Sequence, residues 1–164
     1  MESINGAFSS MLFNSALETG VRAVIVLNAY YPKALGIEGL ILMDHLAVHT
    51  ADVGGPASLH VSVPHRGGEL LIRKPIIEQG VNFMRRIGLI NMIVRHDGFF
   101  YQASENSQPF VRLLKTKYNL DLIKRASWLA ENITEVDHIS IERITTQKIS
   151  RWKMEFYENE SQIF

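Results

Sequence analysis

Six histidines and several nearby carboxylates are the side chains of this 164-residue chain best suited to chemistry. His45 and His49 are four residues apart on a predicted helix, a spacing that puts both imidazoles on one face with Cβ atoms roughly 5–6 Å apart. The other candidates close in sequence are Asp44, Asp52, His60 and His65. Imidazoles and carboxylates can bind metal ions. However, residues 46–48 are Leu, Ala and Val, so the glutamate base of an H-E-x-x-H hydrolase is missing.

Two interpretations of these residues follow. In one, the imidazoles and carboxylates form hydrogen bonds that hold a long loop onto the helix. In the other, suggested by the Asp44-His45 doublet, they belong to a metal-dependent hydrolase, whose activity would be lost on changing His45 or His49. We favour the first and assign no catalytic residue, no metal ligand and no cofactor. The chain has no cysteine, which excludes a thiol nucleophile, and no G-x-S-x-G, S-x-x-K or P-loop motif.

Basic residues form a second candidate site. The formal charge is zero overall but is −3 over residues 1–65, +6 over 66–125 and −3 over 126–164. A positive section of this kind suits contact with DNA or with an acidic protein surface. Glu69 and Glu78 interrupt it, so a merely solvated helix face is the alternative. The candidates for facing DNA or a partner are Arg66, Arg73, Lys74, Arg85, Arg86 and Arg95.

These residues need elements to position them. Ser15 and Glu18 have the spacing of a capping box, which predicts a helix from there to about Tyr31, before Pro32. A second helix fits residues 37–49, and a long loop covers 50–68. We expect a short helix over 69–73 and another that starts at Pro75 and ends at Gly88.

The next section predicts a β-hairpin, with strands at 89–95 and 99–103 around a turn at 96–98. Further helices are expected at about 105–116, 119–133 and 137–157. On the last of these, an apolar stripe lies opposite basic residues: Ile141, Ile144, Ile149, Trp152 and Phe156 against Arg143, Lys148, Arg151 and Lys153. The prediction is a mainly α protein with a small β-hairpin. It is one domain over residues 1–164, with a winged helix-turn-helix core at about 37–103 and a helical C-terminal part at about 104–158.

Both ends of the chain are apolar, with Phe13 near one end and Trp152 and Phe156 near the other. They either pack on this protein's own helices or fill a groove of a partner subunit. The candidate partner interface comprises Phe13, His49, Asp52, His60, His65, Trp152 and Phe156. No apolar stretch approaches the roughly 20 residues of a membrane span, and residues 1–13 lack the features of a secretory signal, so we expect a cytoplasmic protein.

A larger set of residues resembles a known family, the middle component of bacterial ABC three-component systems, whose best-known defence operons are the Lamassu systems. The resemblance spans about residues 13–152 and is most distinctive between His49 and Arg73. It is carried by Phe13-Asn14-Ser15, Glu18, Gly20, Arg22, Tyr31-Pro32, Asp44, Val48-His49, Asp52, Gly54-Gly55-Pro56, Ser58-Leu59-His60, Pro64, Arg66, Gly68-Glu69-Leu70 and Arg73.

The resemblance implies a non-catalytic accessory subunit of an anti-phage or anti-plasmid complex. Its partners would be an SMC-like or Rad50-like ABC ATPase, expected as a dimer, and a nuclease or other effector. The subunit would link the two and restrain the effector until double-stranded DNA is engaged, directly or through the complex. A stand-alone winged-helix transcription regulator is the alternative, and it predicts duplex binding that weakens steeply as salt rises.

Overall fold

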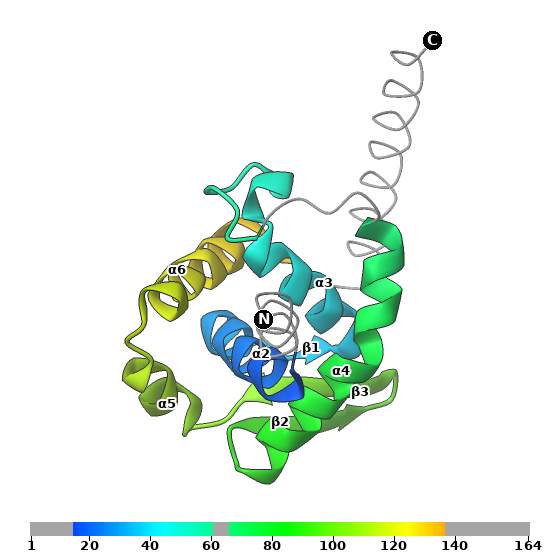
Figure 1. Ribbon diagram of the computed structural model, residues 1–164. Coiled ribbons are helices and arrows are strands. Elements are labelled where there is room, and N and C mark those ends of the chain that lie inside the picture. The colour runs from blue at the N-terminus through cyan, green and yellow to red at the C-terminus, as the bar shows by residue number, and fades with distance from the viewer. Residues whose placement is uncertain (1–14, 61–65, 137–164) are drawn as a thin grey trace, which may run out of the picture.

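The computed structural model describes residues 15–60 and 66–136, and for residues 66–72 the backbone only. Its central element is helix α2 (Ala16–Tyr30), which the other helices surround (Figure 1). The Ser15 hydroxyl accepts a hydrogen bond from the Glu18 backbone N–H at 3.2 Å, which caps the first turn. Residues 22–27 of α2 are all buried, as expected of a helix whose apolar residues occupy every side. The predicted start and end of this helix are therefore confirmed.

Helix α3 (Ile37–Val48) lies beside α2 and has the bounds that the sequence predicts to within one residue. Residues 39–48 are buried without interruption, including Asp44 and His45. A short 3-10 helix, η1 (Thr50–Val53), follows and ends at Gly54, whose φ of 77° is left-handed. The polar residues of α3 are thus held inside the protein rather than on its surface.

Helix α4 (Arg66–Arg86) corrects one prediction. The sequence suggested two helices separated before Pro75, but the structure has one continuous helix with Pro75 inside it. Pro75 itself is exposed, and it cannot donate the usual hydrogen bond to the carbonyl four residues earlier. On the buried side, α4 crosses α2 at two glycines: a Cβ on Gly80 would lie 2.7 Å from the Gly20 nitrogen. Tertiary contacts thus hold α4 on both sides of the proline, at Arg73 through Asp44 and at Gly80 against Gly20.

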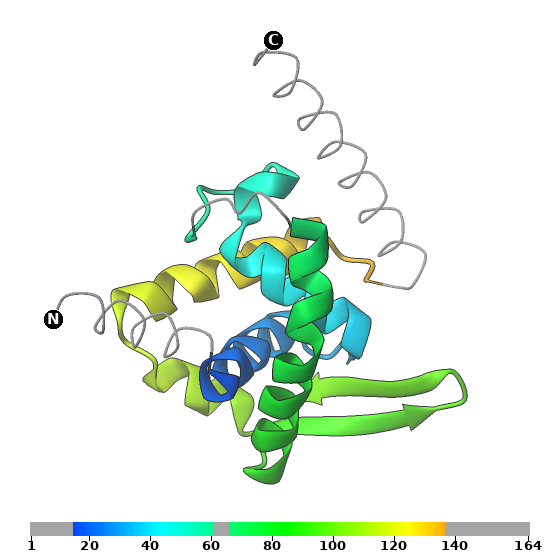
Figure 2. The ribbon, with the colours of Figure 1, turned by 45° about the vertical axis from the view of Figure 1, so that its right-hand side comes forward.

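A three-stranded antiparallel sheet follows, in the order β1-β3-β2. Strands β2 (Ile90–Arg95) and β3 (Gly98–Ala103) form the predicted hairpin, which extends away from the helices (Figure 2). Before the hairpin, α4 ends at Arg86 and is followed by Gly88, whose φ of 81° is left-handed. The Leu89 N–H bonds the Met84 carbonyl at 2.9 Å. Strand β1 (Leu35–Gly36) pairs with β3 and was not predicted, because two residues carry no periodic pattern.

Two further helices complete the described chain: α5 (Ser107–Leu113) and α6 (Lys117–Asn132). Ser107 donates from its hydroxyl to the Leu89 carbonyl, which joins α5 to the start of the hairpin. The buried side of α6, formed by Leu122, Ala126 and Leu129, faces the core made with α2 and α3. The helix predicted at 137–157 lies outside the described residues.

The chain is mainly helical with a small antiparallel sheet, as the sequence predicts. In the part that the structure describes, no helix has the length and apolar character to cross a membrane.

Candidate functional site

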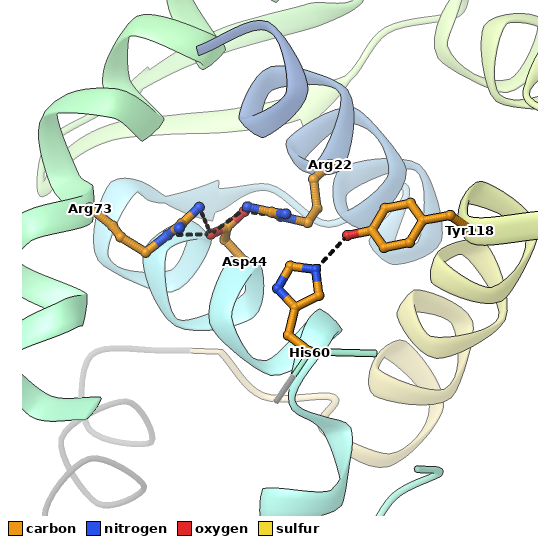
Figure 3. Close-up of polar contacts among 5 residues, drawn as sticks. All are labelled: Arg22, Asp44, His60, Arg73 and Tyr118. Atoms are coloured by element: carbon orange, nitrogen blue, oxygen red, sulfur yellow. Dashed lines mark hydrogen bonds and ion pairs between the residues drawn. The ribbon is translucent and has the colours of Figure 1, made fainter. Parts of the chain in front are cut away.

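The polar side chains of the interior centre on Asp44, which joins three helices (Figure 3). Arg22 of α2 donates from Nε to Asp44 Oδ1 at 2.5 Å, and Arg73 of α4 donates from Nε to Oδ2 at 3.0 Å. A second Arg73 nitrogen, Nη2, lies 2.9 Å from the same oxygen. The exposed fractions of these side chains are 2% for Arg22, 4% for Asp44 and 14% for Arg73. One buried carboxylate therefore pairs with two guanidinium groups.

Burial alone would lower the pKa of Arg22, but the Asp44 carboxylate, with a smaller contribution from Tyr118, makes the net shift of that pKa upward. The guanidinium is therefore charged in the folded protein. A charge at this depth is tolerated only when it is paired, and Asp44 supplies that pairing from the neighbouring helix.

Beside this cluster, the loop after η1 contributes His60 (Figure 3). Its Nε2 lies 2.9 Å from the Tyr118 hydroxyl of α6. Burial, followed by the charges of Arg22 and other nearby groups, lowers the pKa of His60 to about 4. The imidazole is neutral at pH 7, so Nε2 can accept the hydrogen bond that the Tyr118 hydroxyl donates. Burial raises the pKa of Tyr118, which keeps that hydroxyl protonated.

The histidines of α3 continue the same group. The ring centroids of His45 and His49 are 4.5 Å apart, in agreement with their spacing of one helical turn. His49 also meets His60 edge to face at 6.1 Å. His45 Nε2 lies 3.6 Å from Asp52 Oδ2, a separation longer than a hydrogen bond. We call the eight residues Arg22, Asp44, His45, His49, Asp52, His60, Arg73 and Tyr118 the interior network.

Backbone hydrogen bonds hold the loop of residues 49–60 in place around this network. The N–H groups of Leu59 and His60 both bond the Val48 carbonyl, at 3.0 and 3.1 Å. Arg125 of α6 donates two hydrogen bonds to the Ala57 carbonyl, at 2.9 and 2.6 Å. The loop is thus attached to α3 and α6.

The side chains of the interior network are engaged with one another. Asp44 is engaged by two cations, and His60 is neutral and bonded to a tyrosine. Within residues 15–60 and 66–136, no group of three or more histidine and acidic side chains is arranged to hold a metal ion. The contacts of the interior network connect α2, α3, α4, α6 and the loop.

The predicted basic site divides into two parts. Arg73 belongs to the interior network and not to the surface, which its position in the sequence did not reveal. Lys74, Arg86 and Arg95 are exposed and Arg85 is half-buried. The side chain of Arg66 lies outside the described part of the structure.

A polar groove runs between the end of α4 and strand β2. Its lining residues are Asn82, Arg85, Arg86, Ile90, Asn91 and Met92, and none of them is acidic. Arg85 donates to the Asn82 side chain at 3.2 Å, and farther along the hairpin Arg95 lies over the Phe100 ring at 4.6 Å. These side chains offer positive charge to solvent.

The predicted partner interface is also divided. His49 is only 3% exposed, and Asp52 and His60 are half-buried parts of the interior network. His49 therefore has no surface to offer a partner in this conformation. The remaining candidates, Phe13, His65, Trp152 and Phe156, lie outside the described residues.

Sequence reasoning missed Arg22 and Tyr118 as members of the network. Arg22 carried a usable signal, because it is the single charged residue between Glu18 and Tyr30 in a helix that is apolar on all sides. A buried charge in such a helix needs a charged partner from another element. Tyr118 carried no comparable signal.

The sequence comparisons give one match. A family model described as ABC-three component (ABC-3C) system Middle Component 2 matches residues 12–155. No curated protein and no solved structure matches the chain. The matched range includes the interior network, the polar groove and the hairpin.

Proposed function

The chain belongs to the Middle Component 2 family of ABC-three component systems, and from this membership we propose that it is a non-catalytic subunit of an anti-phage or anti-plasmid complex. It links an SMC-like or Rad50-like ABC ATPase, which acts as a DNA sensor, to a nuclease-type effector. It restrains the effector until DNA is engaged, and it works in the cytoplasm. A relation to the Lamassu systems is part of the same proposal.

The observation that carries this proposal is the extent of the family match. It covers residues 12–155 of 164, so the family relation concerns the chain as a whole and not a small motif within it. A middle component is defined by its place among other components, which implies partner subunits. The paired state of the interior network supports a structural rather than catalytic use of the histidines and Asp44.

The fold supports a more specific part of the proposal. From Ile37 on, the elements follow in the order α3, η1, α4 and the β2–β3 hairpin. We keep the winged helix-turn-helix core at about 37–103 as part of the proposal. In a winged helix, the last helix and the hairpin meet nucleic acid. Here those elements are α4 and β2–β3, and they carry Arg85, Arg86 and Arg95. We propose that this surface faces DNA or an acidic surface of the ATPase.

The decisive experiment is affinity purification of this chain after co-expression with the ATPase and effector encoded beside it. The expected result is a stable complex that contains all three proteins and persists through size-exclusion chromatography. Recovery of this chain alone as a monodisperse species, with both other proteins in the flow-through, would contradict the proposal. A stability check on the isolated chain separates absent binding from misfolding.

The polar groove favours one alternative function, a stand-alone DNA-binding regulator. A groove with two arginines and no acidic lining residue can hold a phosphate backbone without any partner. That function predicts specific duplex binding by the isolated chain, with affinity falling steeply as salt rises. The zero net charge weighs against it, because a self-sufficient DNA binder usually carries an excess of basic residues.

A further inference from the structure

The sheet has one long edge that no other strand of the described chain covers. Its order is β1-β3-β2, so β2 pairs with β3 on one side only. The register runs without a bulge from Ile90 opposite Ala103 to Arg95 opposite Gly98. Edge strands are usually protected against further pairing by a proline, a bulge or central charges. Strand β2 has no proline and no bulge, and its one charged residue is the last. It is therefore an open edge onto which a further strand can be added.

The hydrogen-bond pattern defines which backbone groups of β2 face this edge. The Ser104 N–H bonds the Leu89 carbonyl at 3.1 Å, so these two residues are a hydrogen-bonded pair at the start of the ladder. Such pairs alternate along antiparallel strands, so every second residue of β2, from Asn91 on, bonds β3. The N–H and C=O groups of Met92 and Val94 therefore point away from β3, toward the open edge.

The same residues offer apolar side chains on one face of the hairpin. Side chains alternate between the two faces of a strand, so Met92 and Val94 lie on the same face. Val94 is 67% exposed, and Phe99, directly opposite it on β3, is 60% exposed. Figure 2 shows that the hairpin extends beyond the helices at this end. An added strand would thus cover an apolar pair that the fold leaves in water.

Positive charge lies along the same edge. Arg85 and Arg86 line the polar groove beside the first half of β2, and Arg95 ends the strand. Within the part of the chain that the structure describes, none of these three arginines is in an ion pair. The groove has no acidic lining residue either. A carboxylate brought to this edge would meet guanidinium groups that no carboxylate yet engages, so the edge suits an acidic chain.

The backbone groups of the edge distinguish between possible occupants. An extended peptide has both N–H donors and C=O acceptors at the spacing of β2 itself, so it matches both kinds of group. A phosphodiester backbone has oxygen acceptors but no donor, so it would leave the β2 carbonyls unmatched. A second copy of this chain could add its own β2. Antiparallel pairing would then bring Arg95 of each copy toward Arg85 and Arg86 of the other, and like charges oppose that arrangement.

We propose that the open edge of β2 binds an extended, acidic segment of a partner protein by strand addition. The backbone of the segment pairs with Met92 and Val94. Its carboxylates lie beside Arg85 and Arg86, and an apolar side chain covers Phe99. The partner to test is the ATPase encoded beside this chain, because the inference rests on the proposed function. The basic surface thereby receives a protein ligand rather than DNA.

Hydrogen exchange at single-residue resolution tests strand addition on the full-length chain, alone and in complex with the co-expressed ATPase. In the free chain, the amides of Met92 and Val94 have no acceptor on β3, whereas those of Asn91 and Ile93 do. Strand addition supplies the missing acceptors, so we expect exchange at residues 92 and 94 to slow at least about tenfold in the complex. Asn91 and Ile93 are the internal control and should change by less than about threefold.

Proline substitution provides the second arm. Met92→Pro removes an N–H that does not bond β3, a position at which an edge strand tolerates proline. Met92→Ala is the matched control, because it keeps that N–H. We expect Met92→Pro to weaken binding of the ATPase at least about tenfold and Met92→Ala by less than about threefold. Val94→Pro repeats the test at a more exposed position if Met92→Pro melts well below the wild type.

Three results would overturn the proposal. The first is a complex with the ATPase in which residues 92 and 94 exchange as fast as in the free chain, or in which the proline and alanine variants bind equally well. That result would leave the proposed function standing. The second is slower exchange at these residues caused by duplex DNA or by self-association and not by the ATPase, which would make nucleic acid or a second copy the occupant. The third is the absence of any complex with the ATPase, which would contradict the proposed function as well.

Discussion

The interior between α2, α3, α4 and α6 keeps its charged groups in pairs, whereas the end of α4 and the hairpin leave theirs in water. Helix α4 contributes to both regions. Arg73, in the first half of α4, bonds Asp44. Arg85 and Arg86, at the other end of the helix, line an open groove. Chemically identical side chains thus stabilise the fold at one end of the helix and remain available to a ligand at the other.

The difference follows from solvation. A guanidinium buried beside α3 would be very costly without its carboxylate, so Arg22 and Arg73 are committed to Asp44. A guanidinium at the surface gains little from an intramolecular partner because water and salt screen the interaction. Free energy of folding should therefore depend on the interior network, and binding should depend on the surface arginines.

Asp44→Asn should have the largest effect. It removes the carboxylate from two guanidinium groups, and breaking a buried pair in this way costs about 3–5 kcal/mol. Chemical denaturation measures the change in free energy of unfolding. The control is Asp121→Asn, because Asp121 pairs with Lys117, whose side chain is 92% exposed. If both substitutions changed the unfolding midpoint equally, the distinction between the two regions would be lost.

Gly80→Ala should have the second-largest effect on stability. Its comparison with a substitution on the exposed side of α4 tests the two sides of that helix separately. The added Cβ would lie 2.6 Å from the Ala16 carbonyl oxygen, and backbone atoms cannot move aside as a flexible side chain can. We expect a loss of about 1–3 kcal/mol, typical of overpacking. Gln79→Ala, one residue earlier on the exposed side, is the control and should change stability by no more than about 0.5 kcal/mol. A Gly80→Ala protein with the wild-type melting temperature would show that the helices do not cross this closely.

Low pH should reduce the free energy of unfolding, because His60 is held neutral in the folded protein. Its pKa is lowered to about 4 in the folded protein, against 6.5 for an ordinary histidine. Between pH 4 and pH 6.5 the unfolded chain binds more protons at residue 60 than the folded chain does. The contribution of His60 to the free energy of unfolding is therefore fully present above pH 6.5 and declines as the pH falls toward 4. Melting temperatures measured from pH 7.5 to 4.5 should show this decline.

The matched variants for the acid experiment are His60→Asn and His96→Asn. His60→Asn should flatten the pH dependence, whereas replacement of His96, an exposed residue of the hairpin turn, should leave it unchanged. The same dependence of melting temperature on pH in the wild type and in both variants would mean that His60 is not held neutral by its surroundings.

Arg85→Glu combined with Arg86→Glu should have the smallest effect on stability, within about 0.5 kcal/mol, because neither side chain takes part in the interior network. It should nevertheless impair DNA-dependent function. Binding of the assembled complex to duplex DNA, measured by fluorescence anisotropy, checks this. Arg112→Glu with Lys115→Glu gives the same charge change at exposed positions near α5 and should bind normally. Normal DNA binding by the Arg85 and Arg86 variant would exclude this surface as the contact for DNA.

Much of the secondary structure could be predicted because its signals are local. The Ser15 cap, the long apolar runs of α2 and α3, and Gly88 before an apolar strand all depend on neighbours in the sequence. Pro75 misled the prediction because contacts with residues distant in sequence hold the helix on both sides of the proline, Arg73 with Asp44 and Gly80 with Gly20. Strand β1 is defined by its pairing with β3, and no local sequence pattern predicts that pairing.

The candidate site was harder to predict for the same reason. The sequence placed His45 and His49 together correctly, since one helix sets their spacing. It grouped Arg73 with the surface arginines because charge alone does not reveal which side of a helix is covered. Arg22 and Tyr118 reach the network from α2 and α6, so only the tertiary structure brings them to Asp44 and His60.

The central claim is that the interior network supports the fold while the surface carries the function. The most direct measurement is the protection from phage or plasmid conferred by the complete operon, with this chain replaced by His60→Asn or by the Arg85→Glu and Arg86→Glu double variant. The account predicts that His60→Asn retains protection and that the double variant loses it, although its melting temperature is that of the wild type. Loss of protection by a His60→Asn protein that melts normally would contradict the account, because it would indicate chemistry at the interior network.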